Sequence, residues 1–212
     1  MTPSSVLSRL KLWRCSKVGA RVQVLGSVYV VGGGCIEIGD DVVLDGRVVP
    51  VELHAGPASV LSIGHGCVLE GGVSVEAQQR VEIGPGSRLR AFAKVMDNNF
   101  HAVSGSRHKR PASQPVKIEA AVEVGERAIV LPGAWLEAKV TLGPGVVIAR
   151  HVKAGMTVSP PKPRTENTEN APTPDQTVDQ IKEVAAPEIE TTTKPKRPRV
   201  NGGEAVAVVV AP

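Results

Sequence analysis

The sequence predicts an all-β protein in which short parallel strands coil around a narrow aliphatic core. Three observations lead to this fold class: a six-residue apolar repeat over residues 116–158, a shortage of aromatic residues, and an abundance of glycine. Aromatic residues make up 2% of the 212 residues, whereas hydrophobic residues make up 42%. A core that lacks Phe, Tyr and Trp must be built from Val, Ile, Leu and Ala, and such side chains fill a narrow coil.

The repeat is clearest when residues 116–158 are written in sixes from Val116, which gives seven complete rows. The first and third columns are apolar in every row. They hold Val116, Val122, Ala128, Ala134, Val140, Val146 and Val152, and Ile118, Val124, Val130, Leu136, Leu142, Ile148 and Ala154. In a chain that is 42% hydrophobic, fourteen matches in fourteen arise by chance at roughly one in 10⁵. Residues two apart point to the same side of a strand, so each row predicts a short strand with two inward side chains.

So short a strand buries its apolar side only by coiling. Three rows therefore form one triangular turn of ~18 residues, which stacks in parallel on the next turn. Glycines that directly follow inward residues, as at 125, 143 and 155, suit the corners between rows. Apolar residues six apart continue the pattern upstream with longer joins. They are Val24 and Val30, Ile38 and Leu44, Ile63, Leu69 and Val75, and Ile83, Leu89 and Val95. The coil is therefore expected over residues 21–160.

The two ends of the chain differ from the coil. Residues 1–20 are expected to form a short amphipathic helix that caps the coil, with contact to a membrane surface as the alternative. Its apolar face would consist of Val6, Leu7, Leu10 and Trp13. Residues 161–212 are rich in proline and have no periodicity, which predicts a disordered tail. A small basic cluster in this tail does not indicate nucleic acid, and the tail's partner stays open.

Composition argues against several classes of protein. No apolar run reaches the ~18 residues that a membrane span needs, and the N-terminal residues lack the pattern of a signal peptide. The three cysteines, Cys15, Cys35 and Cys67, are too scattered for a disulfide framework or a CxxC zinc site. A cytoplasmic protein without a bound metal is therefore expected.

One interruption of the coil is far longer than the others. Residues 97–115 are polar, contain glycine and proline, and have no six-residue register. A long loop that leaves an otherwise regular coil is a candidate functional site by its position. Its first five residues are DNNFH, which end in His101. An imidazole, with an unperturbed pKa of ~6.5, suits the role of a base that takes a proton from a hydroxyl group.

The rows resemble the hexapeptide repeats of the left-handed parallel β-helix, and the chain resembles the acyltransferase superfamily built on that coil. The resemblance covers roughly residues 22–164. DNNFH resembles the segment that carries the catalytic histidine in sugar O-acetyltransferases, and an arginine before proline, Arg110, follows it as in that family. The run IVLPG over residues 129–133 matches the family's ILPGV row, and PVELHAGP over residues 50–57 resembles bacterial members.

This resemblance implies an acyl-coenzyme-A-dependent O-acetyltransferase that acts on a sugar hydroxyl in surface polysaccharide or glycolipid assembly. Acetyl-coenzyme A would be the co-substrate, no metal would be needed, and the acceptor would be a sugar, a nucleotide sugar or a glycolipid. The relatives are homotrimers with active sites between neighbouring coils. His101 would be the catalytic base, and other residues would orient it or bind the acceptor: Asp97, Asn98, Asn99 and Arg110. The coenzyme would contact Gly133, Gly145, Lys162 and Arg164.

Two other classes stay open. The row before ILPG reads Glu-Val-Gly at 123–125 instead of the family's Trp-Ile-Gly, and the closing Gly-x-Pro-Ala-Lys is reduced to Ser-Pro-Pro-Lys at 159–162. A catalytically degenerate scaffold or interaction protein is therefore the main alternative. A zinc hydratase of the γ-carbonic-anhydrase type needs three histidines, two of them five apart. Here His101 and His108 are seven apart and His65 lies far upstream, which disfavours this class.

Overall fold

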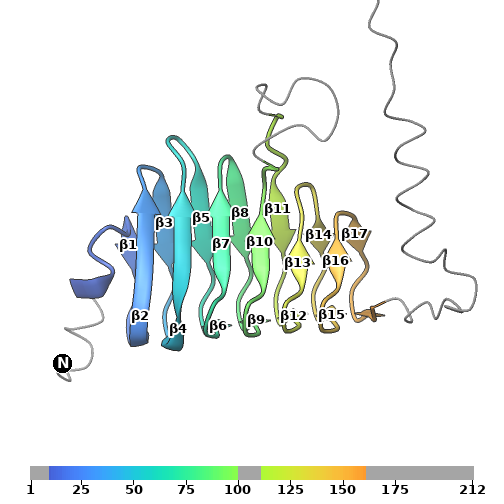
Figure 1. Ribbon diagram of the computed structural model, residues 1–212, viewed down its shortest axis with the longest axis horizontal. Helices are drawn as coiled ribbons and strands as arrows, with labels where there is room; N and C mark the ends of the chain where they lie inside the picture. The colour runs from blue at the N-terminus through green and yellow to red at the C-terminus, as the bar shows by residue number, and fades with distance from the viewer. Residues whose placement is uncertain (1–9, 100–110, 161–212) are drawn as a thin grey trace, which may run out of the picture. The chain divides into compact units, whose positions relative to one another are not determined.

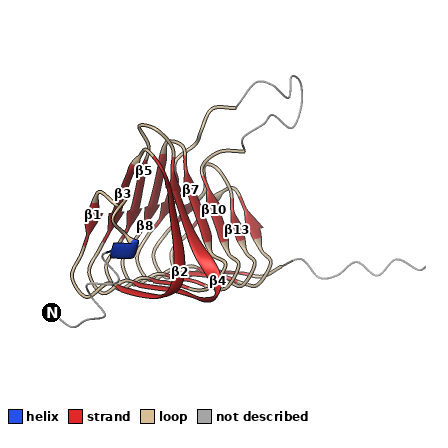
Figure 2. Ribbon diagram, turned by 60° about the vertical axis from the view of Figure 1, so that its left-hand side comes forward, coloured by secondary structure: helices blue, strands red, loops and turns tan. Residues whose placement is uncertain are grey.

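The computed structural model describes residues 10–99 and 111–160 of the chain, and residues 1–9, 100–110 and 161–212 are not described. The described residues form a parallel β-solenoid with three faces (Figure 1, Figure 2). In Figure 1 the strands of the front face point upward, and the chain crosses at the top to the rear face and advances to the right. The coil is therefore left-handed, and the predicted all-β solenoid is confirmed. No helix in the described ranges is long and apolar enough to cross a membrane.

Two sheets make up the three faces. Face A is the seven-stranded sheet of β1 (Lys17–Val18), β3 (Cys35–Ile38), β5 (Val60–Ile63), β8 (Arg80–Ile83), β11 (Val116–Ile118), β14 (Trp135–Leu136) and β17 (His151–Val152). Faces B and C share the second sheet, because two long strands, β2 (Gln23–Gly32) and β4 (Val43–Ala55), bend across the corner between them. Face B adds β6 (Val68–Leu69), β9 (Arg88–Leu89), β12 (Glu123–Val124), β15 (Thr141–Leu142) and β18 (Thr157–Val158). Face C adds β7 (Ser74–Ala77), β10 (Lys94–Met96), β13 (Ile129–Val130) and β16 (Val147–Ile148).

The length of one coil varies along the solenoid. Lys117 pairs with Trp135, which lies three full rows later in the sequence, as the repeat predicts. Glu82 pairs with Lys117, and this coil is much longer because the loop over residues 97–115 lies between the two residues. Trp135 pairs with His151, although three further rows would lead to Lys153. The last coil on face A is therefore the shortest of the three.

The inward residues follow the predicted columns closely. Thirteen of the fourteen residues in the two columns are buried, and the exception is Ala154, which is exposed. The prediction was wrong there because the last coil is two residues shorter than its predecessor. Val152 pairs with Leu136 and takes the inward position, so Ala154 falls in the corner that follows.

The corner between faces A and B has a repeated backbone conformation. One residue in each coil, three positions after an inward side chain, has a positive φ. These residues are Arg21, Asp41, Gly66, Gly86, Ala121, Lys139 and Gly155. Gly125, which was predicted as a corner glycine, is not among these residues. Glycine is needed there because a Cβ would clash with the carbonyl oxygen of Leu142 in the next coil. Glycine at this position lets successive coils approach closely.

The N-terminal end of the solenoid is closed differently from the prediction. Leu10 and Lys11 are helical, and a turn then follows in which the amide of Cys15 donates to the carbonyl of Leu12 at 2.9 Å. This turn directs Leu12 into the core, where 1% of it is exposed, whereas Leu10 and Trp13 are 68% and 74% exposed. The predicted apolar face was therefore wrong at Leu10 and Trp13, and its other two members lie outside the described residues.

Candidate functional site

Asp97 anchors the start of the long loop to the preceding coil. It directly follows β10, and its side chain is fully buried. One carboxylate oxygen accepts a hydrogen bond from the amide of Gln78, and the other accepts from the amides of Gln79 and Arg80, each at 2.7 Å. A carboxylate that accepts three amide donors holds them strongly, so Asp97 fixes the corner between faces C and A.

Asn98 closes the base of the loop. Its Nδ2 donates to the carbonyl oxygen of Pro111 at 3.0 Å and to Oγ of Ser113 at 2.9 Å. The backbone repeats this closure, because the amide of Gln114 donates to the carbonyl of Asp97 at 2.8 Å. The residues that enter and leave the loop are therefore bonded to each other at the edge of the solenoid.

The remaining polar residues predicted at the loop divide into two groups. Asn99 is exposed beside the closed base. His101 and Arg110 lie outside the described residues, as do Lys162 and Arg164 of the predicted coenzyme site. Their roles stay predictions.

The two glycines predicted at the coenzyme site lie at corners, with φ values of 78° at Gly133 and 68° at Gly145. A Cβ on Gly133 would meet Oε1 of Gln114 at 2.5 Å, so the returning end of the loop packs directly on this glycine. Gly145 takes the corner position that Phe92 and Arg127 take in earlier coils. No heavy atom lies within 4 Å of a Cβ built on Gly145. Gly145 therefore borders open space, whereas Gly133 is covered by the protein itself.

The described histidines lie in separate places. His54 is on β4, His65 lies in a corner, and His151 is on β17. Of the three histidines that a zinc hydratase was considered to need, His101 and His108 lie outside the described residues. Within residues 10–99 and 111–160, no three His, Cys, Asp or Glu side chains are grouped so that they could hold a metal ion.

Sequence reasoning missed a ladder of outward side chains on face A. Lys117, Trp135 and His151 are in register on three successive coils. The indole of Trp135 stacks on the imidazole of His151 with ring centroids 4.4 Å apart, and Nζ of Lys117 lies 5.1 Å from the indole centroid. Both faces of the indole are therefore covered by neighbours. The six-residue rows would place Lys153 beside Trp135 in place of His151, so only the shortened last coil reveals the stacked pair.

Two carboxylates flank this ladder, and the pKa of each is lowered by its hydrogen bonds. Nε1 of Trp135 donates to Oε1 of Glu119 at 3.0 Å, and this bond is the largest cause of the lowered pKa of Glu119. The amide of Ala154 donates to Glu137 at 2.9 Å, and this bond, followed by the contact of 2.7 Å with Nε2 of His151, lowers the pKa of Glu137. The ladder is thus a self-contained network that stabilises the C-terminal coils.

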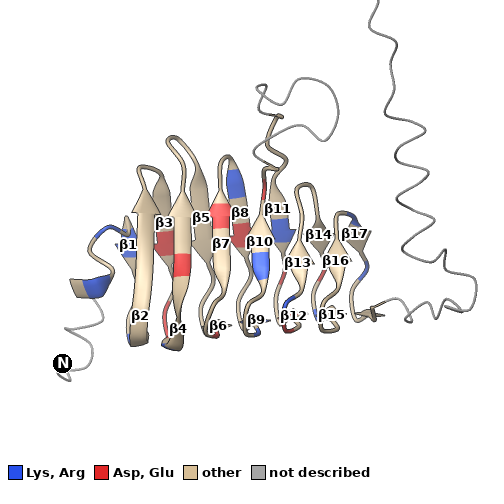
Figure 3. Cartoon of the chain, viewed as in Figure 1, with Lys and Arg blue, Asp and Glu red and all other residues tan. Residues whose placement is uncertain are grey.

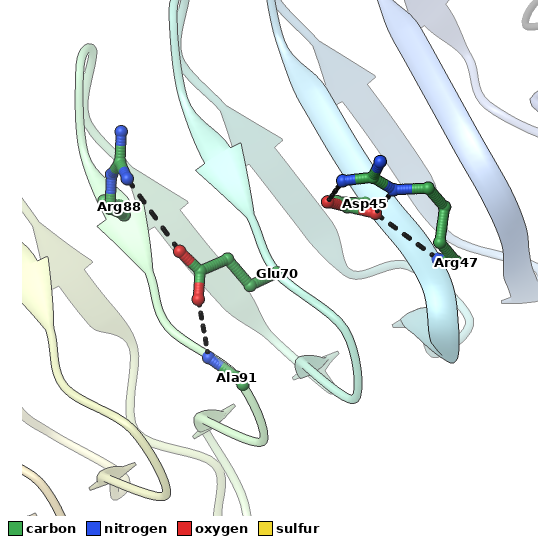
Figure 4. Close-up of polar contacts among 5 residues, drawn as sticks. All are labelled: Asp45, Arg47, Glu70, Arg88 and Ala91. Carbon is green, nitrogen blue, oxygen red and sulfur yellow. Dashed lines mark hydrogen bonds and ion pairs between the residues drawn. The ribbon is translucent and has the colours of Figure 1, made fainter.

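A hollow of about 330 Å³ lies at the corner between faces B and C. Figure 4 shows that the carboxylates beside it are paired. Asp45 accepts from Nε and Nη2 of Arg47 at 2.9 and 2.7 Å. Glu70 accepts from the amide of Ala91 at 3.2 Å and lies 3.9 Å from Nη1 of Arg88. These charges are satisfied by the protein itself.

Two of the cysteines are poorly suited to nucleophilic chemistry. Burial raises the pKa of the Cys15 thiol to about 11, and burial is also the largest cause of the raised pKa of Cys67. Because the thiolate is the reactive form, neither side chain is poised as a nucleophile at neutral pH.

Comparison with known proteins gives matches of structure only. No protein-family model and no curated protein matches the chain. Several solved acyltransferase structures do resemble the solenoid, and three of them are described next.

A maltose O-acetyltransferase from Clostridium difficile 630 is 16% identical, with 74% of this chain and 72% of that chain covered and a TM-score of 0.47. The polySia specific acetyltransferase NeuO is 15% identical, with coverages of 79% and 96% and a TM-score of 0.46. AntD, an N-acyltransferase from Bacillus cereus in complex with dTDP-4-amino-4,6-dideoxyglucose and coenzyme A, is 14% identical, with coverages of 84% and 95% and a TM-score of 0.44. At these values the likeness concerns the coil and says nothing of the chemistry of individual residues.

Proposed function

We propose that this protein transfers an acetyl group from acetyl-coenzyme A to a hydroxyl group of a sugar, with His101 as the general base. The observation that carries the proposal is the anchored base of the DNNFH loop. Asp97 and Asn98 are buried, and they bond to the preceding coil and to the returning end of the loop. A base must be held in position to take a proton from an attacking hydroxyl, and a rigid support three residues away serves this purpose.

The proposed reaction needs one proton transfer and one exchange of bonds. The neutral imidazole of His101 takes the hydroxyl proton while the sugar oxygen attacks the thioester carbonyl carbon. The carbon–sulfur bond then breaks, and the imidazolium returns the proton to the departing thiolate. The products are an acetyl ester of the sugar and coenzyme A. The open corner at Gly145 supports a coenzyme contact there, and Lys162 and Arg164 are proposed to meet its phosphates.

The wider setting is part of the same proposal. The acceptor is proposed to be a free sugar, a nucleotide sugar or a glycolipid used in surface polysaccharide assembly, and the enzyme is proposed to be a cytoplasmic homotrimer. These statements rest on the resemblance of DNNFH and of the IVLPG row to sugar O-acetyltransferases.

The test measures release of the coenzyme A thiol from acetyl-coenzyme A by the full-length protein with a panel of such acceptors. His101→Ala is expected to lower kcat by about 10²-fold or more, because general base catalysis contributes that much. The affinity for coenzyme A and the oligomeric state should not change. His65→Ala is the matched control: it replaces an exposed corner histidine and should leave kcat within about twofold.

Two outcomes would count against the proposal. If His101→Ala keeps the kcat of the wild-type protein, His101 is not the base. If calorimetry detects no binding of acetyl-coenzyme A at millimolar concentration, the protein is a scaffold that shares the coil of an enzyme.

A further inference from the structure

A second hollow, of about 260 Å³, opens on face C over the N-terminal coils. It is lined by outward side chains of three neighbouring strands, β2, β4 and β7. They are Tyr29, Val31, Glu52, His54, Ser74 and Glu76. Figure 3 shows acidic residues on β4 and β7 of this face and a basic residue on the next strand, β10. Drug-sized pockets start at ~300 Å³, so the hollow suits one small molecule.

The side chains form two ladders across the three strands. Tyr29 pairs with Glu52, and Glu52 pairs with Ser74. In the second ladder, His54 pairs with Glu76. Carboxylates, a hydroxyl and an aromatic ring from different coils therefore meet in one place, although no stretch of sequence contains them together.

The carboxylates of this hollow differ from those of the corner hollow. Glu52 and Glu76 form no hydrogen bond or ion pair through their side chains within the described part of the chain. Lys94, on β10 beyond Ser74, also forms no ion pair with either of them in these ranges. Two carboxylates that line one hollow without a partner leave negative charge there, and a cation bound in the hollow can pair with it.

Ser74 lies at the bottom of the hollow. The residue is only 7% exposed, and its hydroxyl has no hydrogen-bond partner among residues 10–99 and 111–160. No fully buried side-chain oxygen or nitrogen in those ranges lacks a partner, so Oγ of Ser74 must open into the hollow. A polar group of a ligand would satisfy this largely desolvated hydroxyl and gain affinity from it.

Ring-bearing side chains also line the hollow. Tyr29 is about half exposed and presents its ring to the hollow. The imidazole of His54 lies over Gly32, where a Cβ would approach Cδ2 of His54 to 2.9 Å. A Cβ on Gly32 would clash first with the carbonyl oxygen of Ala55, so this glycine lets β2 and β4 approach closely beside the imidazole.

We propose that this hollow binds a small ligand that carries a primary ammonium group beside hydroxyl groups, as an amino sugar does. Glu52 and Glu76 accept hydrogen bonds from the ammonium group, and Ser74 bonds to a neighbouring hydroxyl. The ring of Tyr29 packs on the ligand and attracts its positive charge. The hollow binds this ligand whether or not His101 catalyses acetyl transfer, so its test needs no turnover.

The experiment titrates the full-length protein by calorimetry with glucosamine and, separately, with glucose, which lacks the ammonium group. Glucosamine is expected to bind at least about tenfold more tightly than glucose, because its ammonium group adds charge-assisted hydrogen bonds. Glu52→Gln and Glu76→Gln should each weaken glucosamine about tenfold, and Tyr29→Ala should weaken both sugars. Glu37→Gln on face A is the matched control and should leave both affinities unchanged.

Circular dichroism and thermal unfolding establish that each variant keeps the fold. Equal affinity for the two sugars, or no detectable binding of glucosamine at ~10 mM, overturns the proposal. Glucosamine binding that survives the double variant Glu52→Gln/Glu76→Gln also overturns it. Displacement of glucosamine by calcium chloride, with calcium binding at one equivalent, would reassign the hollow to a metal ion.

Discussion

The coils before the long loop and the coils after it share one kind of core but use their outer residues differently. Before the loop, β4 is 13 residues long, and one coil on face A runs from Glu37 to its partner Ser62. After the loop, strands have two or three residues, and each coil on face A is shorter than that one by more than a full row of the repeat. Leu53 in the first region and Leu136 in the second are nevertheless both fully buried.

This difference shows that the residues that define the core and the residues that shape the outer surface are distinct parts of the sequence. Two inward side chains per row are sufficient to define a coil, as the C-terminal coils show. The additional residues of the N-terminal coils extend the strands on face C, and these strands carry the hollow with Glu52 and Glu76. The C-terminal coils instead place a closed ladder around Trp135 on face A. The longer strands of the N-terminal coils therefore carry the hollow, whereas the short C-terminal strands carry the ladder.

The largest effect is expected at the boundary between the two regions. Asp97→Ala removes the acceptor of three backbone amides, which should lower the free energy of unfolding by about 4 kcal/mol. A chain of this length would then lose roughly 10 °C in Tm, measured by circular dichroism. Asp41→Ala is the control, since that carboxylate pairs with Arg21 on the surface and its loss should shift Tm far less. Equal shifts for the two variants would mean that Asp97 does not anchor the loop.

The second prediction compares the effect on stability of one kind of substitution, leucine to alanine, in the two regions. Leu61→Ala, on β5 between complete coils, should cost about 3 kcal/mol of stability. Leu142→Ala, on β15 near the last described coil, should cost less, because the coils beyond it can open locally without global unfolding. Hydrogen exchange should then show faster exchange at residues 140–158 and unchanged exchange around β5. Equal global losses would show instead that the solenoid unfolds as one cooperative unit.

The smallest expected effect is a change with pH in the hydrogen bonds of the two carboxylates beside the C-terminal ladder. The pKa values of Glu119 and Glu137 are lowered in the folded protein, so their bonds stabilise it fully above the ordinary Glu pKa of ~4.3. This contribution is lost as the pH falls through the lowered values. In a Trp13→Phe variant, the emission of Trp135 should change below pH ~4 as the bond to Glu119 weakens. An identical profile in Glu119→Gln would mean that another group titrates.

Sequence reasoning was strongest where one local rule applied repeatedly. The two apolar columns over residues 116–158 were confirmed at every position except Ala154, where a corner shortened by two residues breaks the period. Prediction from the sequence was weakest at the N-terminal end, where the turn after Lys11 buries Leu12 in place of Leu10 and Trp13. A helical periodicity cannot reveal that the helix ends at Lys11, before Leu12 and Trp13.

The loop illustrates the same limit at the candidate site. The DNNFH segment and its departure from the coil were predictable, because polar residues without a six-residue register cannot continue a row. The contacts of Asp97 with the amides of Gln78, Gln79 and Arg80 were not, because these residues lie in the preceding coil. A local sequence pattern contains no information on contacts with another coil, whereas the predicted role of Asp97 beside His101 stays a prediction.

The sequence by itself determined that the chain coils, which side chains face inward over most of its length, and where the coil is interrupted. These properties depend on alternation within a strand, which is local. Only the tertiary structure decided which outward residues become neighbours, as with Tyr29, Glu52 and Ser74 on face C. Those neighbours are set by the length of each coil. Apart from the long loop, the coils shorten from β3 to β17, and their lengths come from corners that the apolar pattern does not specify.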